Sequence, residues 1–268
     1  MKLRGALLGA GNIALRGHAP QWLGPLQAEA EILAIADLSP ENRAAAARLF
    51  PRATVHASAA EALSTPGLDF CDICTPPFTH RGLIELAAAR GVHVLCEKPL
   101  ATTLEDALAI EDVVTRAGIA FHPCHQYNFA PPWLAVKERL GRLGRIHLVE
   151  YAVRRTAANE GNPHWTPQWR TSRELSGGGI LVDHGAHILY QLRGILGDAR
   201  RVSATVRTLR HGDYGVEDTA LVTLDHGDAL ATVSLTWAAR RREIAFRFVG
   251  ERGELSGDES RLEVFTET

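Results

Sequence analysis

Glu97, Lys98 and Pro99 follow a short apolar segment, residues 92–95, which is expected to form a buried strand. In an open α/β sheet, ligands bind beyond the carboxyl ends of the strands, so Glu97 and Lys98 are expected at a ligand site. Lys98 is one of only three lysines in the sequence. The alternative is a surface lysine at the start of a loop.

Asp183 and His187 form a second group with chemical potential. Residues 179–196 are predicted to be helical, and side chains four residues apart share one face of a helix. A carboxylate beside an imidazole can fix the tautomer of the ring and raise its basicity, which suits a general base. One alternative is a structural aspartate–histidine pair. Another is a metal site with His184, but residue 184 faces about 100° away from residue 183 and no convincing third ligand is apparent.

The segment Gly9-Ala10-Gly11-Asn12-Ile13-Ala14 is a G-x-G-x-x-A motif between an expected strand, residues 3–8, and an expected helix, residues 14–27. Gly9 and Gly11 would allow a tight turn and a close approach of the backbone to a diphosphate. The start of the helix, at Asn12 and Ile13, would offer amide groups and a positive dipole end. The alternative is a plain strand–helix turn.

Asp37 ends the next expected strand, residues 31–36. A carboxylate at this position can accept hydrogen bonds from a ribose hydroxyl group and would repel a 2′-phosphate, so NAD is favoured over NADP. Ser39 and Arg43 could still accommodate a phosphate. The sequence therefore predicts NAD or NADP as cofactor, with NAD preferred.

Thr75, Pro76 and Pro77 follow another expected strand, residues 70–74. The prolines stiffen this loop and lack amide donors, which suits packing against a flat cofactor ring, although they could simply end the strand. Cys71 and Cys74 form a C-x-x-C inside the same strand. Alternating side chains would place the two thiols on opposite faces, so a redox pair is not expected.

Strands alternate with helices over the first 122 residues, which predicts a parallel, doubly wound sheet. After His122 the pattern changes to longer strands with a period of two and one embedded helix, which predicts a mainly antiparallel sheet covered on one face. The expected fold class is thus α/β plus α+β. A Rossmann domain would span residues 1–122 and a substrate-binding and oligomerisation domain residues 123–268. The segment His122-Pro123-Cys124-His125 resembles a metal-ligand cluster but is better explained as the strand leaving the first domain.

The composition excludes several classes of protein. With 46% hydrophobic and 22% charged residues, the chain of 268 residues is an ordinary globular protein, and its net charge of −2 gives nucleic-acid binding no electrostatic support. No apolar run approaches the length of a membrane span. The N-terminal apolar run resembles a signal peptide but is interrupted by Gly9, Gly11 and Asn12, so a cytoplasmic protein is expected. Four cysteines argue against a disulfide scaffold.

Taken together, these motifs resemble the Gfo/Idh/MocA oxidoreductase family over nearly the whole chain. Glu97-Lys98-Pro99 is similar to the signature tripeptide of that family, whose lysine is catalytic and contacts nicotinamide and substrate. The run Gly177-Gly178-Gly179-x-Leu181-x-Asp183-x-Gly185-x-His187 is similar to the motif of its substrate domain, in which the histidine accepts the proton. The resemblance thus implies Lys98, Asp183 and His187 as catalytic residues. No metal is expected, because the candidate ligand clusters described above are better explained in other ways.

The motifs and the resemblance together define the expected contacts. The expected cofactor contacts are Gly9, Gly11, Asn12, Ile13, Asp37, Thr75, Pro76, Pro77, His80, Glu97, Lys98 and Gln126. The expected substrate contacts are Lys98, Tyr127, Trp169, Arg170, Asp183 and His187.

The sequence departs from the pattern of the family at two places. Tyr190 stands where many members have an acidic residue, so their pattern of contacts to substrate hydroxyl groups does not carry over there. The sequence also ends at Thr268, soon after residues 250–255, whereas typical members continue with more helix and strand. Part of the usual substrate domain is therefore expected to be missing.

The predicted activity is hydride transfer between nicotinamide and a sugar, polyol or related cyclic alcohol. Two alternatives remain open on the same scaffold: a redox-neutral NAD-dependent glycoside hydrolase and a non-catalytic NAD(P)-binding sensor. A homodimer or homotetramer is expected through the second sheet, because one of its faces, with Thr219, Leu221 and Thr223 beside Leu230 and Thr232, has no second long helix to cover it.

Overall fold

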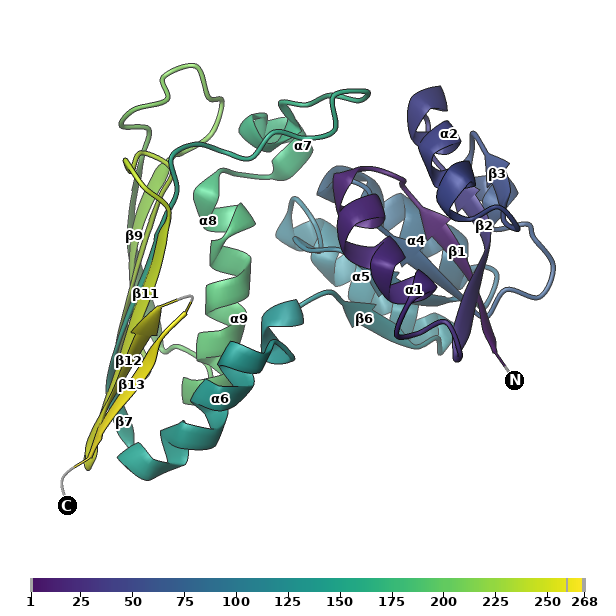
Figure 1. Ribbon diagram of the computed structural model, residues 1–268. Helices are drawn as coiled ribbons and strands as arrows, with labels where there is room; N and C mark the ends of the chain where they lie inside the picture. The colour runs from purple at the N-terminus through teal and green to yellow at the C-terminus, as the bar shows by residue number, and fades with distance from the viewer. Residues whose placement is uncertain (1, 259, 267–268) are drawn as a thin grey trace. The chain divides into compact units, whose positions relative to one another are not determined.

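The structure is a computed structural model and describes residues 2–258 and 260–266 (Figure 1). The chain forms two compact units. The first unit holds Met1–Cys124, Glu160–Arg170 and Glu174–Gly177, and the second holds His125–Asn159, Thr171–Arg173 and Gly178–Thr268. The first unit thus includes two segments, Glu160–Arg170 and Glu174–Gly177, that come much later in the sequence than its main part. The predicted division at residue 122 stays a prediction.

The first unit is built on a six-stranded parallel sheet with the order β3-β2-β1-β4-β5-β6, which confirms the predicted doubly wound class. Its strands are β1 (Leu3–Leu8), β2 (Ala30–Ala36), β3 (Thr54–His56), β4 (Phe70–Ile73), β5 (His93–Cys96) and β6 (Phe121–Pro123). Its helices are η1 (Ala14–His18), α1 (Ala19–Leu23), α2 (Pro40–Leu49), α3 (Ala59–Ala62), η2 (Pro77–Thr79), α4 (His80–Ala88) and α5 (Leu104–Ala117).

Two apolar clusters pack on the two faces of this sheet. One joins Cys71 and Ile73 to α4 and α5, and the other joins Cys74 to η1, α1 and α2. Cys71 and Cys74 therefore lie on opposite faces, both buried, as the strand alternation predicts. Local signals start the helices: Ser39 accepts the amide of Asn42 at 3.2 Å, and Thr103 accepts that of Asp106 at 3.1 Å.

The helix expected over residues 14–27 is shorter and irregular. A π-helix, η1, runs from Ala14 to His18, and only then does α1 begin, with Pro20 in its first turn. Proline has no amide hydrogen, so it cannot continue the α-helical ladder through this point, and the wider π turn precedes it. This irregular turn carries His18, whose role is described below.

The second unit contains a seven-stranded sheet with the order β13-β12-β11-β7-β10-β9-β8. Among its pairs, β10 and β7 run parallel and the other five are antiparallel, which confirms the predicted mainly antiparallel class. The strands are β7 (Ile146–Arg154), β8 (Arg201–Arg207), β9 (Thr219–Asp225), β10 (Leu230–Thr236), β11 (Glu243–Gly250), β12 (Gly253–Asp258) and β13 (Leu262–Thr266). The remaining helices are η3 (Gln126–Asn128), α6 (Pro131–Leu140), η4 (Gly141–Leu143), η5 (Trp169–Thr171), α7 (Arg173–Ser176), α8 (Ile180–Asp183) and α9 (Gly185–Leu196).

Strands β12 and β13 were not among the expected elements. Their residues include Gly253, Gly257 and several acidic and serine positions, which have low strand propensity. Pairing with β11 stabilises β12, and β13 pairs with β12 in turn. Tertiary pairing, rather than local preference, thus builds this edge of the sheet.

The two faces of this sheet differ. Helices α6 and α9 lie on the same side of it (Figure 1), where Val149, Val222 and Val233 are buried. Leu221 and Leu230 point the other way and are 55% and 48% exposed. The predicted separation of an inner and an open face is confirmed, and no helix of the described segments covers the open one.

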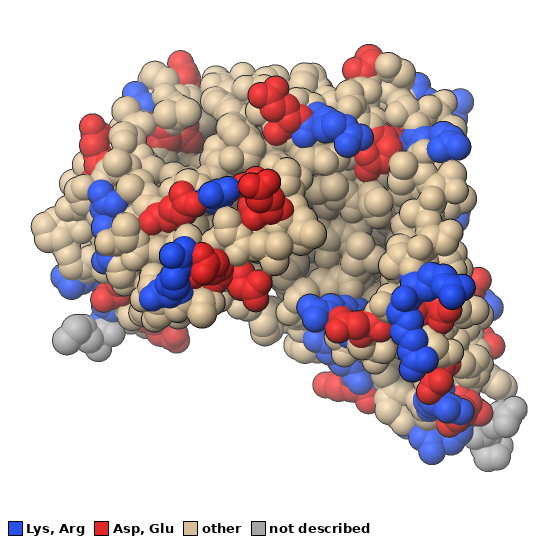
Figure 2. Space-filling model, turned by 180° about the vertical axis from the view of Figure 1, so that it is seen from behind, with Lys and Arg blue, Asp and Glu red and all other residues tan. Residues whose placement is uncertain are grey.

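Charge and hydropathy add little to this picture. Figure 2 shows basic and acidic side chains intermixed over the face in view. None of the helices in the described part of the chain is both long enough and apolar enough to cross a bilayer.

Candidate functional site

The turn after β1 has the geometry that a dinucleotide requires. Gly9 has a φ of +89°, and a Cβ atom there would lie 2.7 Å from Thr75 Cγ2, so only glycine fits. A Cβ atom on Gly11 would meet nothing within 4 Å, which leaves room for a ligand beside the backbone. Helical structure begins at Asn12 and Ile13, so their amides lie in the first turn, where a diphosphate binds. The residues of this turn fit the dinucleotide predicted from the motif.

Asp37 is fixed at the carboxyl end of β2. Its Oδ1 accepts the amide of Ser39 at 2.8 Å and the side-chain amide of Asn42 at 3.2 Å, while Oδ2 accepts the amide of Ala10 at 2.7 Å. A carboxylate has about four acceptor positions, so Oδ2 keeps one for a hydroxyl group. The carboxylate is thereby tied to the glycine turn.

The two residues considered as phosphate partners make hydrogen bonds beside Asp37. Arg43 donates from Nη1 to the carbonyl oxygens of Asp37 and Leu38 at 2.8 and 2.9 Å. Ser39 donates its hydroxyl to Glu41 at 2.7 Å, and this bond is the main reason that the pKa of Glu41 is lowered. A second carboxylate therefore stands beside Asp37, which further disfavours a 2′-phosphate.

The loop after β4 is held by His80. Its Nε2 lies 2.8 Å from the carbonyl oxygen of Thr75, and its Nδ1 lies 3.1 Å from that of Leu100. Burial lowers the pKa of His80, although the two carbonyl groups favour the protonated ring. Thr79 adds hydrogen bonds to the Thr75 hydroxyl and the Pro76 carbonyl. His80 thus connects the Thr75–Pro77 loop to the segment that follows Lys98 and Pro99.

Glu97 lies just beyond β5, as predicted, and is 7% exposed. Its Oε2 accepts the backbone amide of Lys98 at 3.0 Å. Its Oε1 lies 3.0 Å from Nε2 of His18, whose Nδ1 lies 2.9 Å from Asp72 Oδ2. His18 and Asp72 were not among the residues predicted from the sequence. A charged residue in the middle of the apolar strand β4 was the available signal, because a buried charge requires a partner.

Trp169 and Arg170 belong to the first unit, although they were expected as substrate contacts in the second domain. The Arg170 guanidinium lies over the Trp169 ring, 4.3 Å from its centroid. A Cβ atom on Gly161 would lie 2.8 Å from the Trp169 ring, so the lack of a side chain at Gly161 leaves room for the indole.

Close contacts of the backbone explain why glycine stands directly before α8. A Cβ atom on Gly179 would lie 1.8 Å from the carbonyl oxygen of Glu217. That carbonyl accepts the amide of Ile180 at 3.2 Å, and the Glu217 carboxylate accepts the amide of Leu181 at 3.1 Å. Glu217, which was not predicted, thus caps the first turn of α8. Gly177 has a φ of +80°, which also favours glycine.

The single helix expected over residues 179–196 is interrupted at His184. Asp183 ends α8 and His187 lies in the first turn of α9, so the two residues do not sit on one continuous helix. Asp183 Oδ2 lies 3.3 Å from Nδ1 of His184, its neighbour. His184 itself keeps an αR backbone between the two helices, and both the Asp183–His187 pair and the role of Asp183 in orienting His187 stay predictions.

His187 is held by an aromatic ring. It is 6% exposed, and the ring of Tyr127 stacks on it with centroids 4.4 Å apart. One turn further, Tyr190 stacks on His125 at 4.0 Å. Gln126 lies between these two stacking residues in the second unit. The segment 125–127 and α9 thus position each other's side chains. The spacing of these residues along the sequence does not indicate that they stack.

Two groupings of residues in the described chain have donor atoms close enough for a metal ion, and both include His18: one with Glu97 and Cys124, the other with Asp72 and Cys74. Neither corresponds to the clusters considered from the sequence, which were residues 122–125 and Asp183 with His184 and His187.

Known families and proteins match the chain along both units. Residues 3–125 match the model described as "Oxidoreductase family, NAD-binding Rossmann fold", and residues 134–256 match the "GFO/IDH/MocA C-terminal domain". The chain is 32% identical to D-apiose dehydrogenase of Paraburkholderia graminis, covering 91% of this chain and 63% of that protein. It is 30% identical to 1,5-anhydro-D-fructose reductase of Ensifer adhaerens, covering 95% and 75%. Across its curated relatives, the chain spans about half to three quarters of their length.

Solved structures show the same architecture. The WlbA dehydrogenase from Bordetella pertussis, in complex with NADH and UDP-GlcNAcA, superposes with a TM-score of 0.89 at 25% identity, covering 100% of this chain and 78% of that one. A levoglucosan dehydrogenase in complex with NADH and levoglucosan has a TM-score of 0.85 at 26% identity, covering 99% and 76%. The expected family is thus confirmed, and the chain belongs to the GFO/IDH/MocA family of oxidoreductases with an NAD-binding Rossmann fold.

Proposed function

We propose that the protein transfers a hydride between a nicotinamide cofactor and a carbon that bears a hydroxyl group, in a sugar, polyol or related cyclic alcohol. Two relatives support the substrate class by their names, an apiose dehydrogenase and an anhydrofructose reductase. The observation that carries the proposal is the fixed geometry of Gly9, Gly11 and Asp37, which fits a dinucleotide.

The cofactor contacts follow from this geometry. The helix start at Asn12 and Ile13 would hold the diphosphate, Asp37 a ribose hydroxyl group, and the loop of Thr75, Pro76 and Pro77 a flat ring. Bound nicotinamide supplies the hydride acceptor for alcohol oxidation. We infer a preference for NAD from the Asp37 and Glu41 carboxylates, both of which would face a 2′-phosphate with like charge.

The protein's own residues handle the proton and the charge. We infer that His187 accepts the proton of the substrate hydroxyl group and that Lys98 holds the oxygen and stabilises its developing negative charge. Tyr127 fixes the plane of the His187 ring by stacking, and Asp183 is the predicted orienting group. Tyr127, Trp169 and Arg170 remain proposed substrate contacts, and Gln126 and Glu97 proposed cofactor contacts.

A panel of sugars, polyols and cyclic alcohols, each with NAD and NADP, tests this function. The expected result is formation of reduced nicotinamide with at least one compound. Cleavage of a glycoside with the cofactor retained through turnover would instead identify the hydrolase. Tight cofactor binding without any turnover would identify the sensor.

We also propose a homodimer or homotetramer through the open face of the second sheet. One row across that face joins Leu230, Leu148, Val249, Glu254 and Phe265 on five neighbouring strands. Leu230 and Phe265 are 48% and 68% exposed. The row is apolar apart from Glu254, and exposed side chains such as Leu230 and Phe265 suit packing against a copy of the same sheet.

A cytoplasmic location is part of the proposal. The apolar run that resembles a signal peptide forms β1, in which Leu7 and Leu8 are at most 1% exposed. This strand is hydrogen-bonded to β2 and β4 on its two sides, so the first unit requires it.

A further inference from the structure

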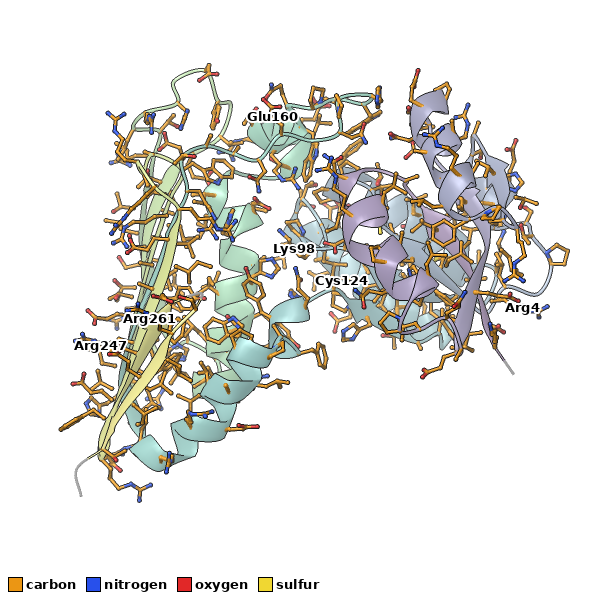
Figure 3. All side chains as sticks on the ribbon, viewed as in Figure 1. Arg4, Lys98, Cys124, Glu160, Arg247 and Arg261 are labelled. Carbon is orange, nitrogen blue, oxygen red and sulfur yellow. The ribbon has the colours of Figure 1, made fainter. Side chains whose placement is uncertain are left out.

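A buried cluster of ionisable side chains lies next to the Glu97–Lys98 peptide, and two of its members, His18 and Asp72, have no role in the function proposed above. His18 comes from η1, Asp72 from β4 and Glu97 from the end of β5. The side chain of Asp72 is fully buried, and those of Glu97 and His18 are 9% and 14% exposed. Figure 3 labels Lys98 and Cys124 in this part of the first unit.

The hydrogen bonds of the cluster form one continuous series. Trp22 donates its indole N–H to Asp72 Oδ2 at 2.8 Å, and Nδ1 of His18 lies 2.9 Å from the same oxygen. Nε2 of His18 lies 3.0 Å from Glu97 Oε1, and Glu97 Oε2 accepts the backbone amide of Lys98 at 3.0 Å. This series of hydrogen bonds thus connects α1, through the His18 imidazole, to the peptide group between Glu97 and Lys98.

The geometry identifies the protonation state of His18. Both ring nitrogens lie 2.9–3.0 Å from carboxylate oxygens, and an ionised carboxylate only accepts hydrogen bonds, so this geometry favours a proton on each nitrogen. Burial alone would lower the pKa of His18, but the hydrogen bonds and charges of Asp72 and Glu97 outweigh it and raise the pKa to about 10. The other titratable neighbours are Cys74 and Cys124, and burial raises the pKa of both thiols well above the usual range. His18 is therefore an imidazolium between two carboxylates.

We propose that His18 and Asp72 are positioning residues for Lys98, because the imidazolium clamps the Glu97 carboxylate that fixes the Lys98 backbone amide. The inference rests on the proposed function for the role of Lys98 in turnover, but the clamp itself is a property of the unliganded first unit. The clamp predicts that a substitution of Asp72 changes the environment of the Lys98 side chain through His18 and Glu97.

A metal ion is the competing explanation for the same residues. Donor atoms of His18, Asp72 and Cys74 lie within 4.8 Å of one another, as do those of His18, Glu97 and Cys124. Binding a metal would require His18 to lose a ring proton and one of its carboxylate partners. The present hydrogen bonds satisfy both ring nitrogens and both carboxylates, so the geometry favours a proton over a metal.

The first measurement is NMR of the protein with isotope-labelled histidine, with His18 assigned from the His18→Gln variant. The clamp predicts that both ring nitrogens of His18 stay protonated at pH values between 6.5 and about 10, where an ordinary histidine is neutral. Metal analysis should find no stoichiometric zinc. A neutral His18 in this range would overturn the proposal. Bound zinc would also overturn it, if a chelator removed both the zinc and the NMR signals of the His18 ring.

The second measurement follows Lys98 directly and needs no substrate. With only three lysines in the chain, the ε-carbon signal of Lys98 can be assigned from Lys98→Arg. Asp72→Asn should shift or broaden this signal and leave those of Lys2 and Lys137 in place. The exposed Asp112→Asn serves as the matched control and should change none of them. An unchanged Lys98 signal in folded Asp72→Asn would refute the positioning role, whatever the reaction proves to be.

The third measurement uses turnover once a substrate is identified. Asp72→Asn removes one carboxylate, so His18 should lose its second proton at a lower pH than in the unaltered protein. The kcat of the variant relative to the unaltered protein should therefore fall about tenfold or more at neutral pH and recover as the pH is lowered, with the KM for the cofactor unchanged. A loss that is the same at every pH would show a merely structural role.

Discussion

At the scale of single residues, Asp37 shows how one carboxylate can be both predicted and explained. Its place at the end of β2 follows from the strand pattern, and the structure adds the hydrogen bond from the Ala10 amide. What the sequence could not indicate is that Ser39 and Arg43 are occupied by Glu41 and by backbone carbonyl groups. These contacts depend on how the first turn of α2 folds over the strand end.

Asp37→Ala should weaken NADH binding about 10- to 100-fold, since a hydrogen bond to a charged group contributes about 1.5–3 kcal/mol. NADPH binding should weaken less or improve, because one repelling charge is removed. Calorimetric titration of both cofactors checks this, with exposed Asp112→Asn as the control. Tighter binding of NADPH than NADH by the unaltered protein would contradict the assignment.

The His18 imidazolium predicts how stability depends on pH. Its pKa is about 10 in the folded protein, above 6.5 for the unfolded chain, so it stabilises the fold fully below pH 6.5. This contribution declines as the pH rises toward 10, because the unfolded state then binds fewer protons. His18→Gln should lower the free energy of unfolding by about 3–5 kcal/mol at low pH, the range for breaking a buried ion pair, and by less at high pH.

Urea unfolding of the unaltered protein and of His18→Gln at several pH values measures this difference. A stability loss that grows with pH, instead of shrinking, would show that His18 is neutral in the folded protein.

At the scale of elements, most strands and helices were predictable because each has a local cause. The alternation of side chains in β4 and β9 predicted which faces of these strands are buried. The elements that differ are those shaped by distant contacts. Glu217 caps α8, and the pairing with β11 stabilises β12.

The same contrast applies to the candidate site. The glycine turn, Asp37, Thr75 and Lys98 could be found because strand ends collect ligands in this sheet type. The stacking of Tyr127 on His187, and the His18 cluster, join residues 60 and 79 positions apart. Spacing along the sequence carries no signal for such contacts.

Gly179→Ala tests the capping of α8. Its Cβ atom would meet the Glu217 carbonyl oxygen at 1.8 Å, so the free energy of unfolding should fall by about 1–3 kcal/mol. Gly194→Ala, in α9 with open space around it, is the matched control and should raise that free energy by about 0.5–1 kcal/mol. Thermal unfolding of both variants distinguishes these effects, and a stable Gly179→Ala would refute the steric argument.

At the scale of the whole molecule, the open face of the second sheet predicts self-association. Leu230→Glu places a charge on the apolar row and should shift the protein toward monomers of 29.1 kDa in light scattering. Leu108→Glu, on the exposed face of α5, is the control and should leave the assembly unchanged. If the unaltered protein is a monomer at tens of micromolar, the proposed interface is wrong.

The central claim is that Lys98 and His187 serve hydride transfer, and one measurement tests it most directly. Turnover with the compound identified in the alcohol panel should fall by roughly 10²–10⁴ in Lys98→Ala and in His187→Ala, the range for losing one positioned acid–base group. NADH binding by His187→Ala, measured by titration, should stay within a few-fold of the unaltered protein. If His187→Ala kept full turnover on that compound, the role assigned to this histidine would be contradicted.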